Sequence, residues 1–199
     1  MSDTSKHMEF DDEPPSSIID RQGACAFPGL ELDIDIVDPL LGDGEQLKGL
    51  LSNVVTAGLR QQLVADEAVA EVFIRVVGVE ESQRLNNEFR GKDYPTNVLS
   101  FPGCDAAEIE QSLVSSASGG PPVMLGDIVI AAPVVEREAR EQGKATMDHF
   151  CHLVVHGLLH VLGHDHIEDA LAEKMEAIEI VILAELGISN PYLLEQVHG

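Results

Sequence analysis

The segment at residues 156–166, HGLLHVLGHDH, constrains the fold of this chain more than any other feature. In it, His160 and His166 follow His156 by four and ten positions, and Gly163 stands between His160 and His166. On a helix, side chains four apart share one face and can bind one ion, while a third ligand must return from beyond the helix end. Gly163 can make that turn because glycine adopts the left-handed conformation without steric cost. The segment therefore predicts a helix end, a sharp turn and three ligands for one Zn2+ per chain.

The spacing matches the metzincin pattern H-E-x-x-H-x-x-G-x-x-H at every position but one. The glutamate that serves those proteases as general base is replaced by Gly157, which cannot move a proton. The sequence thus predicts the metal site of a zinc hydrolase without the residue that makes it a peptidase. A zinc metalloprotease is the alternative enzyme, in which Glu168, just past the triad, would supply the missing base.

Further histidines lie within or just before this segment and need separate interpretation. His149 and His152 extend the same helical stripe but lie one to two turns before His156, so we expect them to support the ligands or to pack. We interpret His164 as a side chain that lines a cleft, with a fourth metal ligand as the alternative. Asp165 either orients a liganding imidazole through its second ring nitrogen or caps the turn.

The charge of the chain limits its partners. A formal net charge of −23 argues against a protein that coats nucleic acid through a basic surface. Seven of the twelve lysines and arginines, however, fall between Arg75 and Lys144. A local positive site in an otherwise acidic protein is therefore compatible with the sequence.

The N-terminus and the cysteines indicate the compartment. The opening residues, MSDTSKHMEFDDEPPSS, are acidic where a signal peptide needs a basic start and an apolar run. No stretch approaches the roughly 18 consecutive apolar residues of a membrane span, and three cysteines without CxxC spacing favour a reducing compartment. We expect a cytoplasmic protein without membrane contact, with a disordered acidic extension at residues 1–28 and one domain at residues 29–199.

The periodicity of the remaining residues predicts an α+β fold. Alternating or β-branched segments predict strands at residues 31–38, 71–77 and 125–132, and a further strand follows the turn at Pro95. Helical stripes separate these strands, while the serine, glycine and proline content of residues 103–122 indicates a long mobile loop. We expect a four-stranded mixed sheet covered by about five helices, with the histidine helix packed beneath the sheet.

Two further motifs, RGKDYPTNVLSFP from Arg90 and LGDIVIA from Leu125, accompany the triad. With them the chain closely resembles the YbeY family of bacterial, single-strand-specific metalloendoribonucleases, from about Glu71 to Tyr192. The resemblance implies a zincin-like α+β domain with one zinc ion on the three histidines. It also implies a role in maturing the 3′ end of 16S ribosomal RNA and in ribosome quality control, with Arg90 as the catalytic arginine. His164 departs from the family, which often has tyrosine there.

The chemistry of these residues agrees with RNA cleavage. Three neutral ligands leave zinc its full charge and an open position for a water nucleophile. Phosphodiester cleavage adds negative charge in the transition state, which the planar fork of Arg90 can bind at two oxygens. An arginine that only caps its helix is the alternative for this position. Lys92 and Arg84 could guide the RNA backbone, and Thr96, Asn97, Ser100 and the edge strand expected at residues 125–131 could flank the cleft.

The acidic surface predicts weak activity on naked RNA, because ribosomal RNA would be repelled except near the cleft. The expected partners are ribosomal RNA and the small ribosomal subunit, with a ribosomal protein and an assembly GTPase as candidate docking surfaces. A non-enzymatic ribosome-assembly factor with structural zinc is a further alternative. Four protein ligands, rather than three plus water, would identify it.

Overall fold

The computed structural model describes residues 29–62, 68–166 and 168–193, and the predicted N-terminal extension lies outside them. The described part contains four strands, six α-helices and one short 3-10 helix. In chain order these are β1 (Leu30–Ile36), the 3-10 helix η2 (Pro39–Leu41), α1 (Gly44–Gln62), β2 (Ala70–Val77), α2 (Val79–Arg90), β3 (Val98–Pro102), α3 (Ala106–Ala117), β4 (Val123–Ala131), α4 (Ala132–Gln142), α5 (Thr146–Val161) and α6 (Asp169–Glu185).

The strands form one mixed sheet in the order β1-β2-β4-β3. β1, β2 and β4 are parallel, and β3 runs antiparallel to β4 at one edge. The register aligns Ile34, Ile74 and Ile128 across the parallel strands and sets Ser100 of the edge strand beside Ile128. These features confirm the predicted α+β class and the four-stranded mixed sheet.

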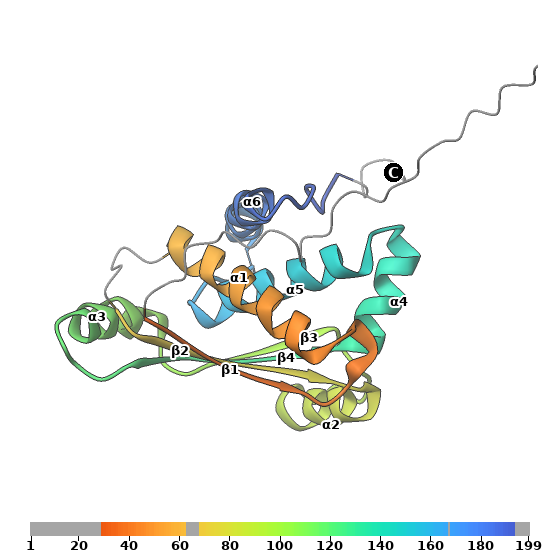
Figure 1. Ribbon diagram of the computed structural model, residues 1–199, viewed down its shortest axis with the longest axis horizontal. Coiled ribbons are helices and arrows are strands. Elements are labelled where there is room, and N and C mark those ends of the chain that lie inside the picture. Colours follow the sequence, from red (N-terminus) through yellow and green to blue (C-terminus); the bar gives the residue numbers. More distant parts are fainter. Residues whose placement is uncertain (1–28, 63–67, 167, 194–199) are drawn as a thin grey trace, which may run out of the picture.

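Helices cover the two faces of the sheet unequally (Figure 1). α1 and α5 lie on one face with α6 outside them, and α2 lies on the opposite face. The main core fills the space between the sheet and α5, where Ile128, Phe150 and Leu158 are fully buried. A smaller cluster around Leu99 lies on the other face, and Leu85 of α2 packs against it. The histidine helix therefore packs against one face of the sheet, as the sequence predicts.

Residues 103–122 contradict the predicted long mobile loop, because most of them form α3. Ile109 and Leu113 lie four positions apart on the buried side of this helix, and each is 6% exposed. The Ser116 hydroxyl accepts from the Val69 N–H at 3.0 Å and donates to the Val69 carbonyl at 3.2 Å. Packing thus overrides the weak helix propensity of the serines. With α3, the described residues contain six α-helices rather than about five.

The edge position expected for residues 125–131 belongs instead to β3. β4 pairs with β2 on one side and with β3 on the other, so it is an inner strand. β3 contains the VLSFP part of the RGKDYPTNVLSFP motif, so this motif lies at the antiparallel edge of the sheet. No helix in the described ranges is long and apolar enough to cross a membrane.

Candidate metal centre

α5 carries the histidine motif through the middle of the molecule. It packs against the sheet, α1 and α6, so most of its residues are buried. Gly157 permits the close approach to the sheet, since a Cβ at this position would lie 2.8 Å from Ile128 Cγ2 and 3.2 Å from Ser100 Oγ. The histidines occupy a strip of the helix that its neighbours leave partly open, and the side chain of His156 is 26% exposed.

The structure brings the three predicted ligands together. One ring nitrogen from each of His156, His160 and His166 lies within 4.8 Å of the others. The Nε2 atoms of His156 and His160 are 3.1 Å apart. A tetrahedral zinc ion bound at about 2.0–2.1 Å would separate two ligand nitrogens by about 3.3 Å. The spacing of these two nitrogens is therefore close to what one such ion requires.

The outer ring nitrogens determine the tautomers of two of these histidines. His156 Nδ1 lies 2.9 Å from Glu179 Oε1, and His160 Nδ1 lies 3.0 Å from the backbone oxygen of His164. A carboxylate and a carbonyl only accept, so each Nδ1 carries the hydrogen and each Nε2 keeps its lone pair.

Two lone pairs thus face each other across 3.1 Å, an arrangement that a shared cation or proton stabilises. Burial, and then the charges of His156 and His166, lower the pKa of His160 to about 4. At neutral pH His160 is consequently unprotonated, so its Nε2 lone pair is available to a metal ion.

Glu179 on α6 holds this arrangement in place, and the sequence analysis missed it. Its side chain is 1% exposed and accepts hydrogen bonds from His156 at 2.9 Å, from His152 Nε2 at 2.8 Å and from the Tyr192 hydroxyl. Burial alone would raise the pKa of Glu179, but these hydrogen bonds and the charge of His152 outweigh it and lower the pKa to about 2. The carboxylate is therefore ionised, which favours a cation on the far side of His156.

The return of the chain toward α5 depends on Gly163. It follows the helix with a φ of 90°, in the left-handed region, as predicted. A Cβ here would also lie 2.4 Å from the Cβ of Ala106 on α3, so both the backbone angle and the available space require glycine. Asp165 Oδ1 accepts a hydrogen bond from the His166 backbone N–H at 2.7 Å but lies 4.0 Å from the His166 ring. Of the two roles expected for Asp165, these contacts favour capping of the turn.

The remaining histidines stand outside the three-histidine group. His164 Nε2 lies 2.8 Å from Gln62 Oε1 at the end of α1, so this side chain bridges the turn and α1 rather than facing the other ligands. His149 Nε2 lies 3.0 Å from Glu138 Oε2 on α4. His152 reaches the group through Glu179 and also lies edge to face with the His156 ring, with centroids 6.4 Å apart, and its supporting role stays a prediction.

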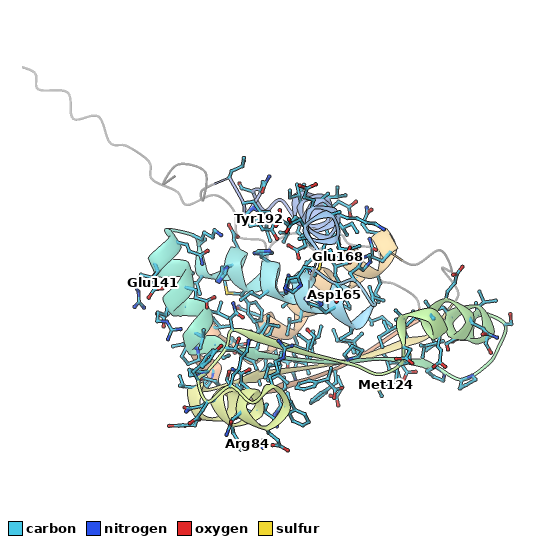
Figure 2. All side chains as sticks on the ribbon, turned by 180° about the vertical axis from the view of Figure 1, so that it is seen from behind. Arg84, Met124, Glu141, Asp165, Glu168 and Tyr192 are labelled. Atoms are coloured by element: carbon cyan, nitrogen blue, oxygen red, sulfur yellow. The ribbon has the colours of Figure 1, made fainter. Side chains whose placement is uncertain are left out.

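The structure does not bring Arg90 into contact with the histidines. Arg90 ends α2, on the face of the sheet opposite α5, and its exposed side chain forms no ion pair within the described ranges. Lys92 is exposed as well. Arg84 lies on the side of the sheet away from Asp165 and Tyr192 (Figure 2) and is engaged by carboxylates of its own helix, at 2.8 Å in the closer pair. The roles predicted for these three basic residues therefore stay predictions.

A cleft of about 380 Å³ opens beside His156 and follows α5 toward the start of the helix. Asn97 and Val98, where the edge strand begins, form part of its wall. Lys144, which follows α4, lines the cleft, whereas Lys92 and Arg84 do not. Lys144, which was not among the predicted site residues, is thus the basic residue that lines the cleft beside His156.

The sequence is similar to one family over most of its length. A family model described as Endoribonuclease YbeY matches residues 40–187. Relatives named Endoribonuclease YbeY are 48% identical in Idiomarina loihiensis, covering 82% of this chain and 91% of the relative, and 48% identical in Alteromonas mediterranea, covering 89% and 97%. The solution structure of TM1509 from Thermotoga maritima covers 81% of this chain and 98% of that chain, at 24% identity and a TM-score of 0.49. Because the family model spans the three histidines and both sequence motifs, this chain belongs to the YbeY family.

Proposed function

We propose that this protein is a zinc-dependent endoribonuclease that acts in ribosomal RNA processing. The observation that carries the proposal is the approach of the Nε2 atoms of His156 and His160 to within 3.1 Å, with His166 beside them. The family description, endoribonuclease, supplies the reaction class. When bound, zinc would supply a Lewis acid and an activated water at its open position.

Two features support a catalytic site over a structural one. The group found in the described residues has three donors, and structural zinc sites almost always have four. His164, the alternative fourth ligand, is bonded to Gln62 instead. The cleft beside His156 also gives a substrate access to the group.

The surroundings of the ligands contribute preorganisation. Glu179 and the His164 carbonyl hold the imidazoles of His156 and His160 with their Nε2 lone pairs directed at one point. These contacts fix the orientation of both rings before substrate binds, so RNA binding does not have to supply the free energy of ordering them.

Arg90 is the residue we assign to the phosphoryl charge of the transition state. Its guanidinium is exposed and free of carboxylate partners within the described ranges, so it is available to phosphate oxygens. α2 and α5 flank opposite faces of the sheet, and the chain passes from Arg90 at the end of α2 directly to β3, so we propose that the RNA reaches both sites around the β3 edge.

Three observations oppose the metalloprotease alternative. Position 157, where a metzincin carries its glutamate, faces Ile128 and Ser100 of the sheet. Glu179, the carboxylate that touches the group, is a weak base, because hydrogen bonds lower its pKa to about 2 against the effect of burial. Glu168 is exposed just before α6, with no hydrogen bond or ion pair to the group among the described residues.

The finer role that we propose is maturation of the 16S ribosomal RNA 3′ end and ribosome quality control in the cytoplasm. A net charge of −23 disfavours free RNA as a partner and supports docking through the small ribosomal subunit, by way of a ribosomal protein or an assembly GTPase. Assembled subunits should therefore be cleaved faster than the same RNA alone.

The test compares zinc-loaded protein on precursor 16S RNA, on single-stranded RNA and on casein. We expect RNA cleavage without proteolysis. His156→Ala and His160→Ala should lower zinc content far below one per chain and abolish cleavage with the fold retained, while His164→Ala serves as the matched histidine control and should keep its zinc. Full zinc content in both ligand variants, or cleavage of casein alone, would overturn the proposal.

A further inference from the structure

The cleft beside His156 has a lining unsuited to phosphate. Glu138 and Glu176 both line it, against one ammonium group, that of Lys144. Two carboxylates would repel the RNA backbone, because like charges at close range disfavour each other. A neutral group of the substrate is the better occupant for the interior of the cleft.

The same cleft offers flat and apolar surfaces. The rings of His152 and Tyr192 meet edge to face with their centroids 5.4 Å apart, and Val98 and Leu153 line the cleft beside them. Its volume of about 380 Å³ falls within the range of small-molecule sites. Flat rings and aliphatic groups of this kind bind the faces of unstacked bases in single-stranded RNA.

One hydrogen-bond acceptor in the lining is held in position without being used up. Glu138 Oε2 accepts from Asn97 Nδ2 at 2.9 Å and from His149 Nε2 at 3.0 Å. Asn97 is itself anchored, because its Oδ1 accepts from the Val98 N–H at 2.7 Å. Glu138 Oε1 accepts no hydrogen bond from the described residues. The carboxylate is thus fixed through one oxygen, and the other is available to a ligand.

We propose that this cleft is a nucleobase pocket, which holds a base next to the scissile phosphodiester and prefers bases whose exocyclic amino group donates to Glu138 Oε1. Cytosine and adenine carry such a group, whereas uracil and hypoxanthine carry a carbonyl oxygen at the same place. Lys144 contacts the neighbouring phosphate at the mouth of the cleft. The inference rests on the proposed function only in taking the neighbouring phosphodiester as the bond that is cleaved, since base binding does not require cleavage.

Burial alone would raise the pKa of Glu138, but the hydrogen bonds from His149 and Asn97 outweigh it and lower the pKa. The carboxylate is therefore ionised at neutral pH and can only accept. A base that presents a carbonyl oxygen to it leaves both groups without a donor, which costs more than a missing contact.

Glu138→Gln tests the proposal by replacing one hydrogen-bond acceptor, Oε1, with a donor. The amide oxygen would take over the bonds from Asn97 and His149, which leaves the amide N–H group where Oε1 stood. Glu141→Gln is the matched control, because Glu141 lies on the same helix (Figure 2) and outside the cleft, with a side chain that is 66% exposed. Both variants lose one negative charge, so an effect of charge alone would appear in both.

The substrates are single-stranded oligonucleotides that differ by cytosine against uracil, or adenine against hypoxanthine, at each position around the cut. The wild type and Glu141→Gln should favour the amino-bearing base at one position by about tenfold, the value of one unpaired buried acceptor. In Glu138→Gln the preference should vanish or reverse. Equal rates for both members of each pair in the wild type, or an equal loss on all substrates in Glu138→Gln, would overturn the proposal.

Binding of cytidine and uridine to the wild-type protein, followed by the NMR signals of the His149 and His152 rings, gives a readout without cleavage. Cytidine should shift these signals at a lower concentration than uridine. Protein that binds cytidine selectively but cleaves no RNA would refute the proposed function and retain the pocket. Protein that cleaves RNA without base preference and binds neither nucleoside would refute the pocket and retain the function. This titration also decides the matter if Glu138→Gln does not fold.

Discussion

Replacing Glu179 by glutamine tests whether a carboxylate on α6 controls the metal ligand His156. In the native site the two carboxylate oxygens receive three donors, from His156, His152 and Tyr192. Glutamine keeps one acceptor oxygen and adds an N–H group. The orientation that keeps most bonds leaves the oxygen with His152 and Tyr192 and turns the amide N–H toward His156 Nδ1. That nitrogen must then accept, so the ring hydrogen moves to Nε2 and blocks the metal-binding lone pair.

The expected loss follows from this change of tautomer. Substitutions of groups that orient a liganding histidine typically weaken metal binding about 10- to 100-fold, which corresponds to about 1.4–2.7 kcal/mol. Glu179 is 1% exposed and His156 only 26% exposed, so water can restore little of the lost orientation, and we expect the upper half of this range. His160 should keep its tautomer, because its Nδ1 donates to a backbone carbonyl that the substitution does not change.

Competition with a chromophoric zinc chelator measures the affinity, and long-range 1H–15N spectra of the metal-free protein report the tautomer of each ring. Glu173→Gln is the control, since it removes the same charge from an exposed position of the same helix. An unchanged His156 tautomer together with wild-type zinc affinity in Glu179→Gln would refute the reasoning. A changed His156 tautomer without any loss of zinc affinity would show that the tautomer of this ring does not control metal binding.

Three further outcomes are expected. Gly163→Val should lower the stability by at least about 1–2 kcal/mol and weaken zinc binding. The control Gly119→Val, at a similar φ of 88° with open space around it, should lower the stability without affecting zinc, and equal zinc affinity in both variants would contradict the turn mechanism. Arg90→Ala should lower RNA cleavage by about a hundredfold at normal zinc content, and Arg90→Lys should recover little of it, with Arg84→Ala as the control. If Arg90→Ala loses activity only together with a lower melting temperature, the residue acts as a helix cap. The stability of the metal-free protein should fall as the pH drops from 6.5 toward 4, because burial lowers the pKa of His160 to about 4 and only the unfolded chain protonates this histidine in that window. A melting temperature that stays constant or rises over this pH range would contradict the prediction.

The parts of the site that are local in sequence were predictable, because helical geometry fixes them. Two histidines four positions apart must share a face, and a glycine after the helix end is the ordinary way to turn the chain back. The structure places His156, His160 and His166 together on this basis. The strands were predictable for a similar reason, since the alternation at residues 30–36 depends only on neighbouring residues.

Contacts between distant segments were not predictable in the same way. Glu179 reaches His156 from another helix, and no spacing rule connects two positions 23 residues apart. A signal was nevertheless present, because Glu179 stands four positions after Met175 and three before Ile182, on the buried stripe of α6. A carboxylate on an apolar stripe needs a partner, and the histidine helix was the obvious supplier. For α3, the pair Ile109 and Leu113 gave a helical signal that the serine and glycine content of the segment obscured.

Gly157 links the packing of this fold to its chemistry. Neighbouring positions on a helix point about 100° apart, so a helix that directs His156 toward the metal directs position 157 elsewhere, and here that direction is the sheet. Ile128 and Val98 lie 2.8 and 3.3 Å from where a Cβ would stand. A glutamate at this position would bury its charge against Ile128, Val98 and the lone Ser100 hydroxyl or force α5 away from the sheet, and either change would disturb the histidines themselves. The metal group of this chain cannot therefore take its proton-transfer residue from the second position of the motif. Groups that assist cleavage have to come from other elements, which is why the cleft beside α5 and the arginine at the end of α2 are the places to look for them.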